Sequence, residues 1–184
     1  LPALFLVMAT QNPIEQEGTY PLPEAQLDRF LMHVKVDYPN SAAERDILKL
    51  ARHEASSGEQ IDQPEVSESI VFAAREEVLT LHMSDAVEEY IVQLIMATRQ
   101  PEAYSSELAS WIEYGASPRA TIGLDRCARA HAWLLGKDFV SPDDVKAMAH
   151  DVLRHRLVVS YDGEISGVTA DDVIDKLLEL VPIA

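Results

Sequence analysis

A short apolar run near the start of the chain limits the folds that it can adopt. Leu4 to Ala9 contains no polar residue, which is typical of a strand covered on both faces in a parallel sheet. Such a strand needs neighbours, and only Val34 to Val36 lies nearby as a second one. A short helical pattern from Pro23 to Leu31, with proline at its first position, separates the two. We therefore expect residues 1–38 to be the end of an α/β core, with its other strands upstream in a longer polypeptide.

The chain beyond Pro39 carries the signals of helices. Ser41-x-x-Glu44 is a capping box in front of an apolar face, and Ser84 precedes apolar residues at positions i, i+3, i+4 and i+7. We predict that residues 39–184 form one helical domain, so that the chain as a whole is mainly α. Further start signals are Ser117-Pro118, Ser141-Pro142 and Thr169, and Leu157 to Ser160 is a candidate short strand.

The charge of the chain excludes one class of partner. Against 31 Asp and Glu it has 15 Lys and Arg, a net charge of -16, so its surface repels the phosphate backbone and nucleic acid is not expected as a partner. The apolar start falls short of the roughly 20 residues of a membrane span and lacks the basic flank of a signal peptide, so no membrane association is expected. The single cysteine, Cys127, cannot form an internal disulfide, which fits a reducing cytoplasm.

Two polar residues in the first segment are candidates for a nucleotide site. Asn12 directly follows the predicted strand, where ligands bind in open parallel sheets and where an amide could orient a water or a phosphate. Alternatively, Asn12 only turns the chain before Pro13. Arg29 lies near the end of its short helix, where the helix dipole favours a cation. It could instead be an arginine finger that reaches the γ-phosphate of a neighbouring subunit. The sequence leaves both pairs of alternatives open.

Arg119 occupies an unusual place for a basic residue. Ser117-Pro118-Arg119 and Ser141-Pro142-Asp143 both read as helix starts, but only the second continues with acids that complement the positive end of a helix. A bound anion would explain the arginine, because free backbone N–H groups and the guanidinium would both face it. A salt bridge to one of the many acids is the alternative, and the sequence weighs the two equally.

Other catalytic arrangements are missing from the sequence. No segment matches the phosphate loop G-x-x-x-x-G-K-[ST], and no apolar strand ends in the Asp-Glu pair that holds magnesium. His150 and His155 would lie about 140° apart around a helix, so they do not form a ready pair of metal ligands. We therefore predict that this chain alone neither grips nor splits ATP, and we expect no metal site in it.

Three segments stand out in order along the chain: Ala9 to Pro13 (ATQNP), Glu15 to Phe30 (EQEGTYPLPEAQLDRF) and Gly115 to Ala120 (GASPRA). Together they resemble the MoxR family of AAA+ ATPases, and the resemblance extends over the whole chain. It implies the end of an α/β P-loop ATPase core followed by a helical AAA+ lid domain. By this resemblance, Asn12 corresponds to the sensor 1 position, Arg29 to the arginine finger and Arg119 to the sensor 2 arginine of the lid.

The resemblance also implies a function for the full-length protein. Proteins similar to this one are hexameric, chaperone-like ATPases that use ATP and Mg²⁺ to help mature or assemble other proteins, often with von Willebrand factor A domain partners. In such proteins the phosphate loop and the magnesium-binding acids precede this segment. Nucleotide and metal are therefore expected in the full-length ring and not on this chain alone. The alternative is a stand-alone acidic helical adaptor without ATPase activity.

Overall fold

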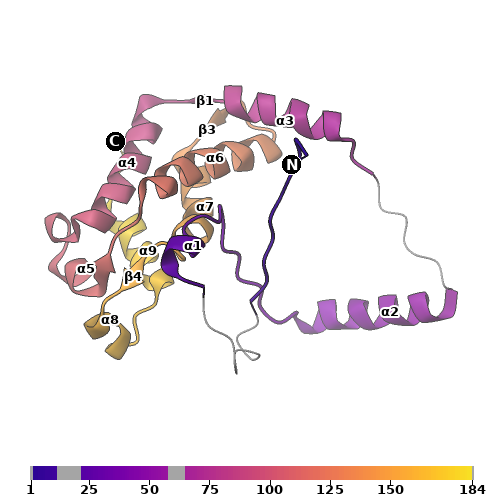
Figure 1. Cartoon of the computed structure of the whole chain (residues 1–184), viewed down its shortest axis with the longest axis horizontal. Helices are drawn as coiled ribbons and strands as arrows, with labels where there is room; N and C mark the ends of the chain where they lie inside the picture. The colour runs from indigo at the N-terminus through magenta and orange to yellow at the C-terminus, as the bar shows by residue number, and fades with distance from the viewer. Residues whose placement is uncertain (1, 12–21, 58–64, 184) are drawn as a thin grey trace.

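Helices make up most of the protein, which confirms the predicted mainly α class. The computed structural model describes residues 2–11, 22–57 and 65–183, arranged as in Figure 1. The helices are α1 (Glu24–Leu27), α2 (Ser41–Ser57), α3 (Glu68–Thr80), α4 (Asp85–Arg99), the 3-10 helix η2 (Pro101–Ala103), α5 (Ser106–Trp111), α6 (Pro118–Leu134), α7 (Pro142–Leu153), α8 (Tyr161–Ile165) and α9 (Ala170–Leu180). The strands are β1 (His82–Met83), β2 (Ile112–Tyr114), β3 (Phe139–Val140) and β4 (Val158–Val159).

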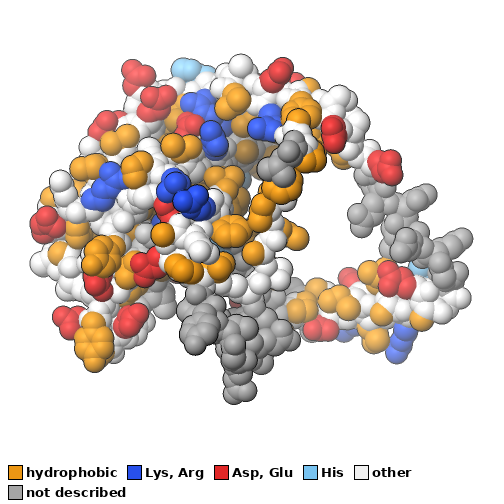
Figure 2. All heavy atoms as spheres, viewed as in Figure 1, with side chains coloured by type: hydrophobic (Ala, Val, Ile, Leu, Met, Phe, Trp, Pro, Cys, Tyr) orange, Lys and Arg blue, Asp and Glu red, His pale blue; other side chains and the backbone are white. Residues whose placement is uncertain are grey.

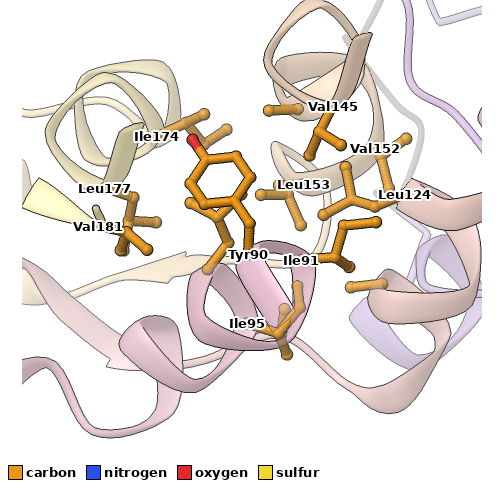
Figure 3. Close-up of a cluster of buried hydrophobic side chains, with 14 of the residues drawn as sticks. Tyr90, Ile91, Ile95, Leu124, Val145, Val152, Leu153, Ile174, Leu177 and Val181 are labelled. Carbon is orange, nitrogen blue, oxygen red and sulfur yellow. The ribbon is translucent and has the colours of Figure 1, made fainter. Parts of the chain in front are cut away.

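The hydrophobic core lies between α4, α6, α7 and α9. The helical spacing predicted for α4 places Tyr90, Ile91 and Leu94 on one buried face. Figure 3 shows side chains of α4 pointing toward Leu124 of α6 and Leu177 of α9. Both leucines are fully buried, and burial of one such side chain stabilises a fold by about 1.5 to 3 kcal/mol. The core therefore fixes the relative positions of α6 and α7, which carry one side of the site described below.

The predicted helix starts are confirmed in this body. Ser84 accepts a hydrogen bond from the backbone N–H of Val87 at 3.4 Å, and Thr169 forms a capping box with Asp172. Gly136 follows the end of α6 with a φ of 69°, a conformation that favours glycine.

Two pairs of short strands join the helices. β1 pairs with β3 in parallel, which aligns Met83 with Val140, and β2 pairs with β4 antiparallel. β4 lies within the segment predicted as a short strand, Leu157 to Ser160. Its partner β2 follows directly after α5, so the pair holds α5 near the end of α7.

The first part of the chain lies outside this core. Figure 1 shows α2 standing apart from the helical body, and its apolar residues Ile47 and Leu48 are about half exposed. No strand forms at residues 4–9 or 34–36, so both strand predictions are wrong for this chain. A strand needs a hydrogen-bonded neighbour, and the segments described at residues 2–11 and 22–57 supply none. Whether a domain boundary falls at residue 39 stays a prediction.

Two local predictions in this part also need correction. The helix expected over Pro23 to Leu31 is reduced to α1, and Pro23 precedes it as its N-cap residue and is not the first helical residue. At α2 the cap is Asn40, whose side-chain oxygen accepts hydrogen bonds from the backbone N–H groups of Ala42 and Ala43 at 3.1 and 3.0 Å. The asparagine caps the helix one residue earlier than the expected capping box, whose Ser41 and Glu44 would have bonded each other's backbone N–H groups, and it replaces that box.

Candidate functional site

The start of α6 carries the first predicted site residue. Ser117 caps the helix and Pro118 opens it. The N–H of Arg119 donates to the Ser117 hydroxyl at 3.2 Å, and the N–H of Ala120 donates to the Ser117 carbonyl at 2.9 Å. The helix start itself therefore supplies acceptors for these two N–H groups. The side chain of Arg119 is the donor that remains, and it is 55% exposed.

An anion does lie at this helix start, and it belongs to the protein. The carboxylate of Asp28 accepts from the Ser117 hydroxyl at 2.9 Å, from Arg119 Nη1 at 3.1 Å and from Arg156 Nε at 3.1 Å. Of the two alternatives for Arg119, the structure thus shows the salt bridge. Burial alone raises the pKa of the Asp28 carboxyl, but the bonds from Ser117, Arg119 and Arg156 outweigh it and hold that pKa below its usual value.

Arg156 is the buried member of this cluster. Its side chain is only 2% exposed, and it lies three residues after the end of α7. Besides the Asp28 carboxylate, its guanidinium donates to the carbonyl oxygens of Phe30 at 2.5 Å, Leu31 at 3.2 Å and Asp28 at 3.3 Å, and to that of Val152. A buried guanidinium needs such partners, since an unpaired buried charge is costly. Arg156 therefore joins α7 to the turn after α1.

Arg29 sits in the same turn with its side chain exposed. The side chain of Arg29 makes no hydrogen bond or ion pair with any residue in the described parts of the chain, whereas the carboxylate of Asp28 beside it accepts three hydrogen-bond donors. Through the bond between Asp28 and Arg119, the structure thus brings the turn that carries Arg29 next to the start of α6. Asn12, the third predicted site residue, lies outside the described residues. Figure 2 shows Lys and Arg side chains gathered along α6 on this face.

Sequence reasoning missed Asp28 and Arg156. Asp28 stands next to a residue that was singled out, and a lone acid at that position gives no sign of its partners. Arg156 follows α7, where a cation is favoured by the helix end whatever it touches. Its contacts with Asp28 are 128 residues away in the chain, so local pattern carries no signal for them.

A cavity of about 450 Å³ lies beside this turn. Residues 7–11 form one of its walls, and Leu27, Phe30 and His33 contribute to the other. His155 also lines it and shares the Phe30 carbonyl with Arg156, at 3.1 Å from Nε2. Burial lowers the pKa of His155 to about 4, so this imidazole is neutral at neutral pH.

Among the described residues, no helix is long and apolar enough to cross a membrane.

Two family models match the segments that the Asp28 cluster joins. The model "ATPase family associated with various cellular activities (AAA)" matches residues 1–32, and the model "AAA lid domain" matches residues 106–177. The first contains Asp28 and Arg29, and the second contains Ser117, Arg119 and Arg156. The salt bridges around Asp28 therefore join an AAA core segment to an AAA lid.

The chain is similar to known proteins over its whole length. It is 41% identical to Chaperone MoxR1 of Mycobacterium tuberculosis, across 100% of this chain and 48% of that protein. It is 36% identical to Protein MoxR of Paracoccus denitrificans, across 84% of this chain and 48% of that protein. A solved crystal structure from Cytophaga hutchinsonii superposes with a TM-score of 0.90 at 41% identity, across 100% of this chain and 56% of that one. The chain spans about half the length of the curated relatives that it matches. It is a homologue of the MoxR-type AAA+ ATPases, from the end of the AAA core through the lid domain.

Proposed function

We propose that this chain is the nucleotide-sensing and lid portion of a MoxR-type AAA+ ATPase, which binds and hydrolyses ATP as a hexameric ring. The observation that carries the proposal is the position of Arg119 at the start of a lid helix, directly beside the turn that holds Arg29. Two arginines with different surroundings are thus carried by neighbouring elements, the start of α6 and the turn after α1. We assign them different tasks on the phosphates of ATP.

Arg119 is suited to hold a phosphate of the nucleotide bound by its own subunit. Within the described part of the chain, only Nη1 of its guanidinium is engaged, by Asp28, and a guanidinium has five N–H donors in a fork that matches phosphate. Since the side chain is more than half exposed, its other N–H groups can donate hydrogen bonds to a second anion without breaking buried contacts. ATP with Mg²⁺ would supply the phosphoryl chemistry, and the phosphate loop expected upstream in the full-length protein would grip it.

Arg29 is suited to act outside its own subunit. Its neighbour Asp28 is tied to Arg119 and Arg156, while the Arg29 side chain is exposed and unpaired within the described segments. A free guanidinium held on a fixed turn is what an arginine finger requires, because the finger must reach the charge that develops on a neighbour's γ-phosphate. Asn12 would orient the attacking water as sensor 1.

The output that we propose is chaperone-like remodelling or maturation of another protein in the cytoplasm. It rests on the similarity to the protein named Chaperone MoxR1. A von Willebrand factor A domain protein is our candidate client, as the resemblance to the family implies. The net charge of -16 argues against nucleic acid as the client.

Mixed rings test the division of labour between Arg29 and Arg119. Full-length Arg29→Ala subunits are mixed with subunits whose phosphate loop is disabled, and ATP turnover is measured across mixing ratios. We expect Arg29→Ala alone to slow turnover by up to about 10³-fold with little loss of ATP affinity. Mixed rings should regain activity at interfaces that pair an intact nucleotide site with an intact finger.

The matched variant is Arg119→Ala, which should weaken ATP binding and gain nothing from mixing. If no mixing ratio restores turnover to Arg29→Ala despite confirmed co-assembly, the assignment of Arg29 to the neighbouring site is wrong.

A further inference from the structure

Arg156 fixes the turn that carries Arg29, although it lies in the lid. Its guanidinium donates to the carbonyl oxygens on both sides of Arg29, those of Asp28 at 3.3 Å and Phe30 at 2.5 Å, and to the Asp28 carboxylate at 3.1 Å. The Leu31 carbonyl is a further acceptor at 3.2 Å. One side chain thus determines the path of the backbone from residue 28 to residue 31.

The packing around this guanidinium leaves it little freedom. α6 passes close by at Gly123, where an added Cβ would lie 3.0 Å from Val152 Cγ1, 3.8 Å from Leu31 Cδ1 and 4.0 Å from Arg156 Nη1. The glycine therefore makes room for α7 and the turn to meet against α6. Arg156 is almost fully buried there, so its bonds to the turn are not exchanged for bonds to water.

Asp28 and Arg29, which are adjacent in the chain, differ in how their side chains are held. Asp28 is held by two arginines and a hydroxyl, whereas Arg29 is exposed and free among the described residues. Arg156 fixes the backbone of the turn at residues 28–31. The exposed guanidinium of Arg29 is therefore directed toward solvent or toward a neighbouring molecule.

We propose that Arg156 is a positioning residue for Arg29: from the lid, it holds the turn so that Arg29 is directed at the nucleotide site of the adjacent subunit. The inference rests on the proposed function of Arg29. It makes the lid of one subunit responsible for the finger that this subunit offers to its neighbour. We call residues 28–31 the finger turn. Because Arg119 shares the Asp28 carboxylate with Arg156, Arg119 and the finger turn are joined through the side chain of Asp28.

The test uses full-length Arg156→Ala and Arg156→Lys rings. We expect Arg156→Ala to lower kcat by up to about 10²-fold, the loss that a misplacement of about 1 Å can cause, with KM for ATP changed less than about twofold. Lysine keeps the charge beside Asp28 but lacks the planar fork for several carbonyls, so the Arg156→Lys loss should be intermediate. In mixed rings with subunits whose phosphate loop is disabled, Arg156→Ala should regain activity as Arg29→Ala does.

Hydrogen exchange supplies a readout that does not depend on turnover. In Arg156→Ala the amides of Arg29, Phe30 and His33 should exchange faster, because their hydrogen bonds lie in the turn or join it to α7. Amides of α4 should be unchanged. If Arg156→Ala fails to fold, the same comparison is made with Arg156→Lys, which retains the buried charge pair.

Arg129→Ala is the matched control. Arg129 is also a partly buried lid arginine, with a side chain 15% exposed that donates to Asp125 at 2.8 Å and to the Leu81 carbonyl. It lies away from the finger turn, so its loss should leave kcat near the parent value. Recovery of Arg29→Ala but not of Arg156→Ala in mixed rings would overturn the inference alone. Failure of both to recover would overturn the proposed function.

Discussion

Asp28 shows how one side chain can decide what its neighbours are able to do. Its carboxylate accepts hydrogen bonds from Ser117, Arg119 and Arg156, and no acid in the described residues pairs with the adjacent Arg29. Because the carboxylate neutralises the buried Arg156, its removal would leave a charge with carbonyl oxygens as its only partners. Loss of one member of such a pair costs more than the pair itself contributes.

Replacing Asp28 by Asn therefore tests the cluster directly. We expect Asp28→Asn to lower the free energy of unfolding of the chain by about 1 to 3 kcal/mol, because a hydrogen-bonded charge is lost beside a buried guanidinium. Urea denaturation followed by circular dichroism measures this loss. Asp46→Asn is the control: its pair with Lys49 at 3.0 Å is exposed on both sides, so its loss should stay within about 0.5 kcal/mol. Equal losses in the two variants would contradict the role given to Asp28.

At the scale of elements, the sequence predicts helices far better than it predicts strands. Ser84, Ser117 and Thr169 mark helix starts correctly, because a cap and the face that follows it are local features. The short helices α5 and α8 were missed because six and five residues give too little periodicity. The run from Leu4 to Ala9 has the pattern of a buried strand, but the ladder that makes a strand depends on segments far away in the chain.

The site follows the same division between local and long-range information. The sequence singled out Arg29 and Arg119, and the structure places the turn of one beside the helix start of the other. It could not say that Asp28 and Arg156 join them, since those contacts cross 91 and 128 residues. The anion that explains Arg119 in this structure is likewise a side chain from a distant element.

The contact between α7 and the finger turn should weaken in mild acid. The Nε2–H of His155 donates to the Phe30 carbonyl at 3.1 Å, and burial lowers the pKa of this imidazole from 6.5 to about 4 in the folded chain. The unfolded chain therefore binds the proton first, so this contribution to stability is present above pH 6.5 and is lost as the pH falls toward 4. Between pH 7 and pH 5 we expect a loss of up to about 2 kcal/mol.

The variant His155→Gln isolates this titration. Glutamine can still bond to a carbonyl but does not titrate, so its unfolding free energy should change less between the two pH values. Urea denaturation at each pH measures both proteins. A parent chain that loses no more stability than His155→Gln would show that His155 is not the titrating group.

The molecule as a whole exposes more surface than a compact protein of its size. Its accessible surface is 12944 Å² for a mass of 20.4 kDa, whereas a compact monomer of that mass exposes about 8,800 Å². The core lies within residues 83–181, so the excess belongs chiefly to the segments before it. Figure 2 shows apolar side chains lining the first segment and α2. Such surface is normally covered in the protein that uses it.

The 184-residue chain by itself should consequently self-associate. Leu6 and Met8 are 84% and 83% exposed in an extended segment, and Val36 is 90% exposed in another, so both segments offer apolar side chains together with unpaired backbone groups. Sedimentation velocity should show an average mass that rises with concentration. The double variant Leu6→Asp with Met8→Asp should reduce this association, because the charges oppose burial of the segment. Ile165→Asp, at a residue 68% exposed on the separate helix α8, should leave it unchanged. If the chain stays monomeric at every concentration, or if the double variant and Ile165→Asp alter association equally, the apolar first segment is not the surface through which the chain associates.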